Sequence, residues 1–290
     1  MNTTRVHLWL FLVACLTCGT LSVQAQAPAQ DDSVTVRSGI SYLQSDLENK
    51  YAKTQCQLDL YLPPKTEKTF PLLVWFHGGS LKGGSKTNAN TVRVARSLAA
   101  RGVGVAVAEY RVNPKVKYPV YIQDCAQAVR WATEQSASIG ARPAVYVGGH
   151  SAGGYLAAML AMDPKYLNEA GVKPEQLAGF IPMSAQLMTH YVVAGERGLG
   201  RTAITADEAA PIHHIRKDHP PLLLLVGGKD FPARLEENQY FHAALTKIAG
   251  SDKASLVVIP DRNHGGILSK TADENDPAAL AILKFLNVGN

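Results

Sequence analysis

The chain shows two kinds of hydrophobic pattern, and each predicts a different kind of strand. Apolar and polar positions alternate over residues 33–43 and 55–62, which predicts an antiparallel pair of strands that ends before Pro63. Continuous apolar runs follow, and these are typical of parallel strands that helices cover on both faces. The runs occupy residues 72–76, 103–108, 144–147, 180–183, 222–226 and 256–259.

Segments with one apolar face at helical spacing lie between these runs. They cover residues 91–100, 121–134, 155–162, 235–248 and 277–286. This alternation of strands and helices predicts an α/β fold, in which helices flank both faces of a mostly parallel, doubly wound central sheet. In such a sheet, functional side chains gather at the carboxyl ends of the strands.

Residues 1–27 predict a secretory signal peptide. Arg5 is followed by an apolar run over residues 8–16, and small residues then lead to Ala-x-Ala cleavage sites that end at Ala25 and Ala27. The apolar run is too short for a convincing membrane span. We therefore expect a secreted or periplasmic protein with no integral membrane span.

A lipid-anchored protein is the alternative interpretation of this leader. Residues 12–15 resemble a bacterial lipoprotein box in which Cys15 would carry the lipid. The apolar character continues well past Cys15, which favours ordinary cleavage. In either case residues 28–290 have the length of one large α/β domain with an ample core.

The charge balance argues against a nucleic-acid partner. Without the leader and its Arg5, the chain holds 28 basic and 24 acidic residues, a scattered and mild balance of +4. Two cysteines remain, Cys56 and Cys125. They form either a disulfide in an oxidising compartment or two buried thiols, and the sequence leaves both open.

Residues 148–154, Gly-Gly-His-Ser-Ala-Gly-Gly, contain the motif on which the functional prediction depends. A short apolar strand precedes it and an alanine-rich helix follows, so Gly149-His150-Ser151-Ala152-Gly153 has the context of a nucleophile elbow. The glycines let strand and helix approach closely, and the strained turn raises the Ser151 hydroxyl above the sheet. For the pentapeptide alone, an incidental serine in a glycine-rich turn is the alternative.

The sequence also predicts donors for a developing oxyanion. His77-Gly78-Gly79 follows an apolar strand, and consecutive glycines supply accessible backbone N–H groups that no strand ladder uses. The helix that follows Ser151 begins with the N–H of Ala152. We therefore predict an oxyanion hole from Gly78, Gly79 and Ala152, with His77 as a brace for its loop.

A serine nucleophile needs a general base, and His264 is the candidate. It follows the last apolar strand, in a stretch with two glycines that we expect to be a loop able to carry the imidazole to Ser151. The remaining histidines outside the leader occupy the elbow, the oxyanion segment, a helix or polar connections: His150, His77, His242, His190, His213, His214 and His219.

The base in turn needs an orienting carboxylate, which we assign to Asp230. Asp230 follows a long apolar strand and a glycine turn, so it is placed at the carboxyl edge of the sheet. Asp261 is the rival, but its closeness to His264 along the chain makes the geometry awkward. The order Ser151, Asp230, His264 is the order that accompanies this type of elbow.

With these motifs the chain resembles the α/β-hydrolase superfamily, and above all the branch of hormone-sensitive-lipase-like carboxylesterases, feruloyl and acetyl-xylan esterases and arylformamidases. The resemblance covers nearly the whole chain after the leader. It includes further segments of that branch, namely Glu109-Tyr110-Arg111, Tyr118-Pro119 and Asp124. It implies the α/β-hydrolase fold and a buried framework ion pair between Arg111 and Asp124. The oxyanion segment departs from the pattern, because Ser80-Leu81-Lys82 stands where small and aromatic residues are common.

The resemblance and the triad imply a serine esterase that works through an acyl-enzyme on a small-molecule ester. No cofactor or metal is expected, because the sequence contains no His-x-x-x-His pair, cysteine cluster or P-loop. An amide hydrolase of the same fold, similar to arylformamidases or peptidases, is one alternative. A non-catalytic binding protein with this fold is a more distant one.

The segment over residues 184–216 is a candidate pocket-forming insertion within the domain. It has weak periodicity and several polar residues, and it follows a strand end, where this fold builds its substrate pocket. The segment is too short for a thick lipase lid and has no broad apolar face. We therefore expect short-acyl esters, or esters of sugars and phenolics, as substrates.

Overall fold

The computed structural model describes Met1 and residues 33–43, 49–65, 68–200 and 202–288. Apart from Met1, the predicted signal peptide and Cys15 lie outside these residues. The described residues from Ser33 onward belong to one compact unit. The boundary between a leader and a domain at residue 28 stays a prediction.

Eight strands form one sheet in the order β1-β2-β4-β3-β5-β6-β7-β8. The two alternating segments are β1 (Thr35–Ser41) and β2 (Gln57–Leu62), and β2 pairs antiparallel with β1 and with β4. All remaining pairs are parallel. The continuous apolar runs are β3 (Leu72–Phe76), β4 (Gly104–Ala108), β5 (Val145–His150), β6 (Leu177–Met183), β7 (Leu222–Lys229) and β8 (Ala254–Asn263).

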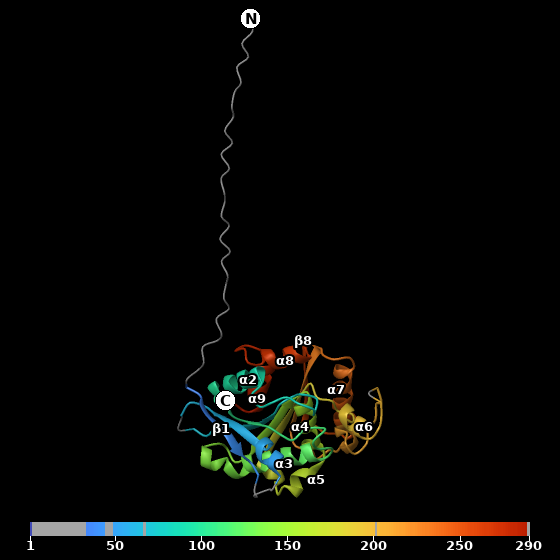
Figure 1. The fold of residues 1–290 in the computed structure, drawn as a ribbon, viewed down its shortest axis with the longest axis horizontal. Coiled ribbons are helices and arrows are strands. Elements are labelled where there is room, and N and C mark those ends of the chain that lie inside the picture. Colours follow the sequence, from blue (N-terminus) through green and yellow to red (C-terminus); the bar gives the residue numbers. More distant parts are fainter. Residues whose placement is uncertain (2–32, 44–48, 66–67, 201, 289–290) are drawn as a thin grey trace. The chain divides into compact units, whose positions relative to one another are not determined.

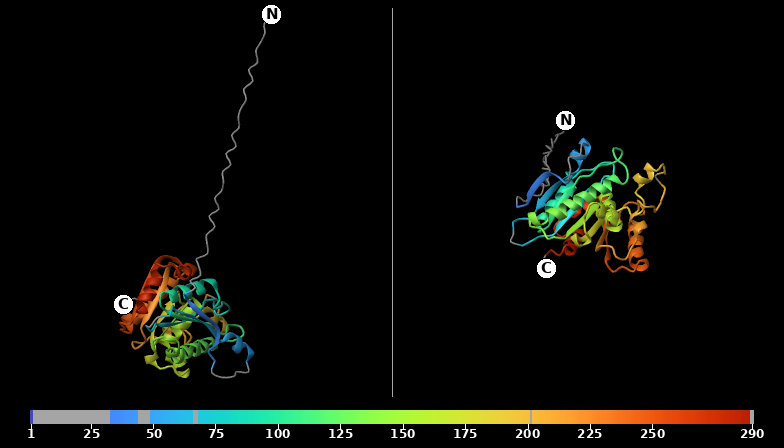
Figure 2. Two further views of the ribbon diagram at one scale, coloured as in Figure 1. Left: turned by 90° about the vertical axis from the view of Figure 1, so that its left-hand side faces the viewer. Right: turned by 90° about the horizontal axis from the view of Figure 1, so that it is seen from below.

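Helices cover both faces of the sheet, which confirms the predicted fold class (Figures 1 and 2). One apolar layer contains residues of α2 (Ala89–Ala100), α8 (His264–Lys270) and α9 (Pro277–Phe285). The other contains residues of α3 (Val120–Gln135), α4 (Ala152–Met162), α5 (Pro164–Glu169) and α7 (Arg234–Ala243). This two-sided cover explains why β3 and β4 are apolar throughout, since every residue of both strands is buried.

The local structure differs from the sequence prediction at three short helices. Residues 50–55 form α1 (Lys50–Gln55), whose start is capped by the side chain of Asn49, so β2 begins two residues later than predicted. The stretch after β6 contains α6 (Tyr191–Glu196), capped by His190. The third is α5, capped by Asp163. In each case one polar side chain accepts from free N–H groups of the first turn. These helices are too short to produce a periodic pattern of apolar residues.

The expected framework ion pair is present between the start of the β4–α3 connection and α3. Arg111 donates to both carboxylate oxygens of Asp124, at 2.8 and 2.6 Å, and the Arg111 backbone N–H donates to the same group at 3.0 Å. The Asp124 side chain is 3% exposed. The bidentate geometry offsets the unfavourable burial of these two charges.

Cys56 and Cys125 are both buried and free. Burial, with the nearby Asp124 carboxylate, raises the pKa of Cys56 to about 12, so the thiol is protonated and chemically inert at neutral pH. Of the two states that the sequence leaves open, the structure contains the pair of thiols. None of the described helices combines the length and apolar composition that crossing a membrane would require.

Candidate active site

Ser151 stands in a turn between β5 and α4 that only small neighbours permit. Its backbone has φ 58° and ψ −117°, a strained conformation for a residue with a side chain. A Cβ atom on Gly149 would lie 2.6 Å from the carbonyl carbon of Gly153. A Cβ on Gly153 would lie 2.0 Å from the carbonyl oxygen of Phe76 in β3. The two glycines of the motif are therefore required by close backbone contacts within the turn and with β3.

A continuous hydrogen-bonded chain joins Ser151, His264 and Asp230. The Nε2 atom of His264 lies 2.9 Å from Ser151 Oγ, and its Nδ1 atom lies 2.7 Å from Asp230 Oδ1. Because a carboxylate only accepts, Nδ1 carries the proton and Nε2 is free to accept from the serine hydroxyl. The Asp230 side chain is fully buried, whereas that of His264 is 13% exposed.

Asp230 is held as a carboxylate by three donors. Besides His264, the hydroxyl of Ser184 donates to Oδ2 at 2.5 Å and the backbone N–H of Phe231 donates to Oδ1 at 2.7 Å. Burial alone raises the pKa of Asp230, but these hydrogen bonds outweigh burial and hold that pKa below its ordinary value. Both carboxylate oxygens are thus fixed, so the group presents its charge to His264 in one orientation.

His264 is the first residue of α8 and not part of a loop, which corrects the prediction from its two glycines. The side chain of Asn263 caps this helix by accepting from the N–H of Gly266 at 2.7 Å. The aromatic ring of Phe231 stacks on the imidazole, with ring centres 3.9 Å apart. The imidazole is therefore carried by a capped helix end and needs no flexible segment.

His150 holds the backbone of His264 in place through a hydrogen bond. Burial, together with the nearby imidazole of His264, lowers the pKa of His150 to about 4, so its ring is neutral at neutral pH. Its Nε2–H group donates to the carbonyl oxygen of His264 at 2.8 Å. The middle residue of the Gly-His-Ser segment thus links the elbow to α8, a link of 114 residues in sequence.

The three residues predicted as oxyanion donors surround the Ser151 hydroxyl side of the turn. Gly78 is close enough that a Cβ there would lie 3.3 Å from Ser151 Cβ. Gly79 has φ +128°, which excludes other residues, and a Cβ there would lie 2.1 Å from the oxygen of Gly83. Ala152 is the first residue of α4, where the backbone N–H has no acceptor within the helix.

His77 braces this loop, as the sequence predicts. Its side chain is 1% exposed, its Nδ1–H donates to the Gly78 oxygen at 2.7 Å, and its ring stacks on Tyr110. The Tyr110 hydroxyl also donates to the backbone oxygen of His77 at 2.7 Å. The imidazole of His77 is thus held by the loop, by Tyr110 and by the Glu109 carboxylate, which lies 3.4 Å from its Nε2 atom.

The other candidates considered from sequence are engaged elsewhere. Asp261, the rival acid, is exposed and pairs with Lys229 at 3.1 Å. His242 and His219 contact Ala254 and Ser251. The remaining histidines contact backbone groups of their own segments, namely His190, His213 and His214.

A cleft of about 650 Å³ is lined by residues of α6, of α7 and of the segments next to them. Its lining includes Pro232 and Ala233, which follow Asp230 and Phe231 directly. Tyr191 lines both this cleft and an adjoining one of about 320 Å³ that reaches Lys82 on the oxyanion loop. Residues close in sequence to Asp230 and to the oxyanion loop therefore line these two spaces.

The segment over residues 184–216 contributes to this cleft and to the core. Its buried residues include Leu187, and Val192 and Val193 of α6, which pack in the apolar layer. Its cleft-lining residues are Gln186, Met188, Thr189, Tyr191, Thr202, Ala203 and Ile204. Two large apolar side chains in this region are exposed. Ile204, which lines the cleft, is 82% exposed, and Phe231, which precedes the lining residue Pro232, is 55% exposed.

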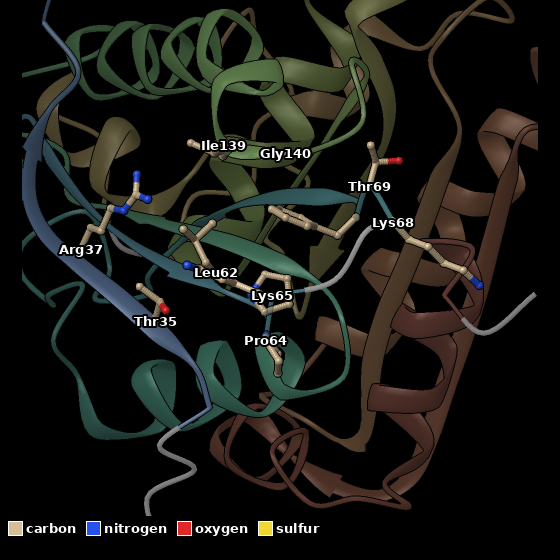
Figure 3. A pocket seen from close by; sticks show the side chains of 11 residues that line it. Thr35, Arg37, Leu62, Pro64, Lys65, Lys68, Thr69, Ile139 and Gly140 are labelled. Carbon is tan, nitrogen blue, oxygen red and sulfur yellow. The ribbon is translucent and has the colours of Figure 1, made fainter.

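A second cavity, of about 370 Å³, lies away from this site (Figure 3). Its lining includes Thr35 and Arg37 of β1, together with Phe70 before β3 and Gly140 before β5. These positions mark the amino-terminal ends of the parallel strands, whereas Ser151 and Asp230 lie at the carboxyl ends. Among the described residues, no group of three or more His, Cys, Asp or Glu side chains has a geometry that would hold a metal ion.

Comparisons with known proteins agree with this geometry. The BD-FAE family model matches residues 58–177, which include β2 to β5 and the elbow. A solved truncated carbohydrate esterase from gut microbiota superposes with a TM-score of 0.69 and 17% identity, over 89% of this chain and 97% of its own. The chain therefore has the α/β-hydrolase fold.

Curated relatives extend the similarity beyond the region of the family model. Esterase LipC from Mycobacterium tuberculosis is 28% identical over 76% of this chain, although the chain spans only 59% of LipC. Kynurenine formamidase from Danio rerio is 24% identical over 90% of this chain and 92% of its own length. The chain is thus similar to proteins named for ester and for formamide hydrolysis.

Three side chains of the α/β-hydrolase site carried no usable sequence signal. No motif surrounds Ser184, so the sequence does not indicate a role for it, although it follows a strand end as Asp230 does. For the stacking of Phe231 on His264, the only indication in the sequence is that Phe231 follows Asp230 directly. Arg234 lines the cleft from the first turn of α7, and nothing in its local sequence distinguishes it.

Because His150 and His190 are buried and neutral, we expect the folded protein to become less stable on mild acidification. Burial lowers the pKa of His150 to about 4 and, with the charges of Arg234 and Lys82, that of His190 to about 3. The unfolded chain takes up these protons near pH 6.5, so the free energy of unfolding should fall as pH drops from 6.5 to 4.5. The slope is at most about 1.4 kcal/mol per pH unit for each histidine.

Urea denaturation at several pH values measures this slope in the wild type and in His190→Asn. Asparagine keeps an acceptor for the N–H of Val192 at the start of α6 but has no proton to gain. The variant should show a shallower pH dependence in this window. An unchanged slope would contradict the assignment of His190 as a buried neutral group.

Proposed function

We propose that this protein hydrolyses carboxylic esters through a covalent acyl-enzyme on Ser151. The observation that carries the proposal is the hydrogen-bonded chain Asp230–His264–Ser151, at 2.7 and 2.9 Å, beside the glycines of the oxyanion loop. The similarity to LipC and to other proteins named as esterases supports the same reaction. Nucleophile, base and orienting acid then have the roles expected from the sequence.

The first half-reaction forms the acyl-enzyme. As Ser151 Oγ attacks the carbonyl carbon, its proton passes to Nε2 of His264, and Asp230 stabilises the imidazolium that results. The carbonyl oxygen gains the negative charge and accepts from N–H groups of Gly78, Gly79 and Ala152. When the ester C–O bond breaks, Nε2–H returns the proton to the departing alcohol oxygen.

The second half-reaction repeats these steps with water. His264 Nε2 removes a proton from the water that attacks the acyl carbon, and the acid is released as Ser151 Oγ regains a proton. The 13% exposure of the His264 side chain gives water access to this atom's surroundings. Asp230 stays ionised throughout, in keeping with its lowered pKa.

We propose short-acyl esters, or esters of sugars and phenolics, as the substrate class. The cleft is open and partly polar, and its polar lining residues are Gln186, Thr189, Thr202, Arg234, Glu236 and Glu237. The exposed ring of Phe231 beside His264 offers a flat surface for an aromatic or sugar ring. An amide substrate is the second candidate, because kynurenine formamidase resembles the chain over 90% of its length.

Removal of the nucleophile or the base should abolish hydrolysis without unfolding the protein. Ser151→Ala and His264→Ala are each expected to lower kcat on 4-nitrophenyl acetate by on the order of 10⁴–10⁶. The double variant should lose little more, because the residues act as one unit. Circular dichroism and thermal melting provide the folding control. An active Ser151→Ala protein, free of wild-type contamination, would sink the proposal.

The hydroxyl of Ser184 is expected to position Asp230. Ser184→Ala removes a 2.5 Å hydrogen bond to a buried carboxylate, so kcat should fall about 10- to 100-fold with little change in KM. Ser184 has φ +51°, which glycine adopts without strain, so Ser184→Gly is the matched variant that removes strain and hydroxyl together. Wild-type kcat in both variants would contradict the positioning role.

Esters with long acyl chains should be hydrolysed less efficiently than esters with short ones. In a series of 4-nitrophenyl esters, kcat/KM is expected to fall from acetate or butyrate to decanoate. Added methylenes contribute about 0.8 kcal/mol each only where walls bury them, and the cleft is open to solvent. A steady rise in kcat/KM up to long-chain esters would show that a deep acyl tunnel exists.

A further inference from the structure

Arg234 is a buried cation whose donors are largely unused. It is the first residue of α7, its side chain is 14% exposed, and it lines the cleft of about 650 Å³. Its Nε and Nη1 atoms are buried and have no hydrogen-bond partner among the described residues. A guanidinium left without acceptors in a low-dielectric site is unfavourable, so this arrangement suggests an acceptor from outside the chain.

The backbone around Arg234 is held firmly, so the unused donors do not reflect a loose side chain. Glu237, one turn further along α7, accepts from the N–H groups of Leu187 and Met188 at 2.6 and 2.7 Å. The amide of Asn238 donates to the backbone oxygen of Ala185 at 3.0 Å. The first turn of α7 is therefore fixed to the chain that follows β6, on the same side as Ser184.

Glu237 forms an ion pair with Arg234, and the other acidic groups nearby have other donors or are exposed. Glu237 Oε2 lies 3.3 Å from Arg234 Nη1 without hydrogen-bond geometry, while its Oε1 serves the two backbone N–H groups. Asp230 is saturated by Ser184, Phe231 N–H and His264. Glu236 faces the cleft from an exposed position. Burial lowers the pKa of Arg234 although Glu237 and Asp230 oppose this, so its charge is incompletely compensated.

A second cation borders the same cleft. Lys82 on the oxyanion loop is exposed and lines the adjoining space of about 320 Å³, which shares Tyr191 with the larger cleft. Both Lys82 and Arg234 act electrostatically on His190, the neighbour of Tyr191. A ligand in these two spaces therefore meets the cations Arg234 and Lys82, together with the carboxylates of Glu236 and Glu237.

We propose that the physiological ester carries a free carboxylate, on its acyl or its alcohol part, and that Arg234 binds this carboxylate. A planar guanidinium with free Nε and Nη donors matches the two oxygens of a carboxylate. The inference rests on the proposed ester hydrolysis, because it assigns the part of the substrate that does not react.

Pairs of esters that differ only in a carboxylate or a carboxamide test this inference. For the alcohol part the pair is 4-acetoxybenzoate and 4-acetoxybenzamide, and for the acyl part it is monophenyl adipate and phenyl adipamate. The measured quantity is the ratio of kcat/KM for the carboxylate over the carboxamide. In the wild type this ratio should exceed one in at least one pair.

Arg234→Gln should lower that ratio by at least about tenfold, since a charge-assisted hydrogen bond is lost, while Arg234→Lys should give an intermediate value. Comparing variants on the same pair cancels the intrinsic reactivity of each ester. Arg93→Gln is the matched control, because Arg93 is an exposed arginine on α2 paired with Asp273, and it should keep the wild-type ratio.

Two results would overturn the inference. One is a wild-type preference for the carboxamide in both pairs, which needs no variant to be folded. The other is an unchanged ratio in Arg234→Gln. Either result is distinct from failure of the proposed function, in which the wild type would hydrolyse neither these esters nor phenyl acetate.

Discussion

The contact between α4 and β3 at Gly153 and Phe76 is the constraint on which the site depends. A Cβ on Gly153 would lie 2.0 Å from the Phe76 oxygen, so the start of α4 presses directly on the backbone of β3. That closeness bends the chain sharply at Ser151 and directs its backbone N–H to the oxygen of Met183, at 2.8 Å. The same contact places the oxyanion loop, which continues from Phe76, beside the serine. Ser151 and the predicted oxyanion donors are thus positioned by one packing contact.

From the elbow outward, the site is held by polar groups that span the sheet. Ser184 follows β6, Asp230 follows β7 and His264 follows β8, and a hydrogen bond joins each to the next. His150 closes the arrangement from β5 to His264. Because these groups are largely buried, each donor and acceptor must be matched, and the matching fixes orientations that exposed side chains would not keep. Rigidity at the carboxyl edge therefore follows from burial together with complete pairing.

The cleft contrasts with this saturated network. Around Asp230 every carboxylate oxygen has a donor, whereas one turn away Arg234 keeps buried donors without acceptors. Asp230 follows β7 and Arg234 begins α7, so one short segment carries the acid of the hydrogen-bonded chain and part of the cleft wall. Ala233, with φ +65°, makes the turn between them. Such strain in a non-glycine residue persists where surrounding contacts determine the backbone, as Glu237 and Asn238 do here.

The sequence alone predicted the fold class, which the structure confirms, and three residues that the structure joins by hydrogen bonds, because these predictions depend on local patterns. Buried strands are apolar throughout, the elbow requires its glycines, and Asp230 and His264 each follow a strand whose carboxyl end must lie at the same edge. Only the tertiary structure decided that His264 begins a helix, since one capping side chain, Asn263, outweighs two glycines. It alone also revealed Ser184, His150 and Arg234 as parts of the site. Their roles arise from contacts between segments that lie 46 to 114 residues apart, or from donors left unpaired in a cleft, and neither property produces a pattern in the local sequence.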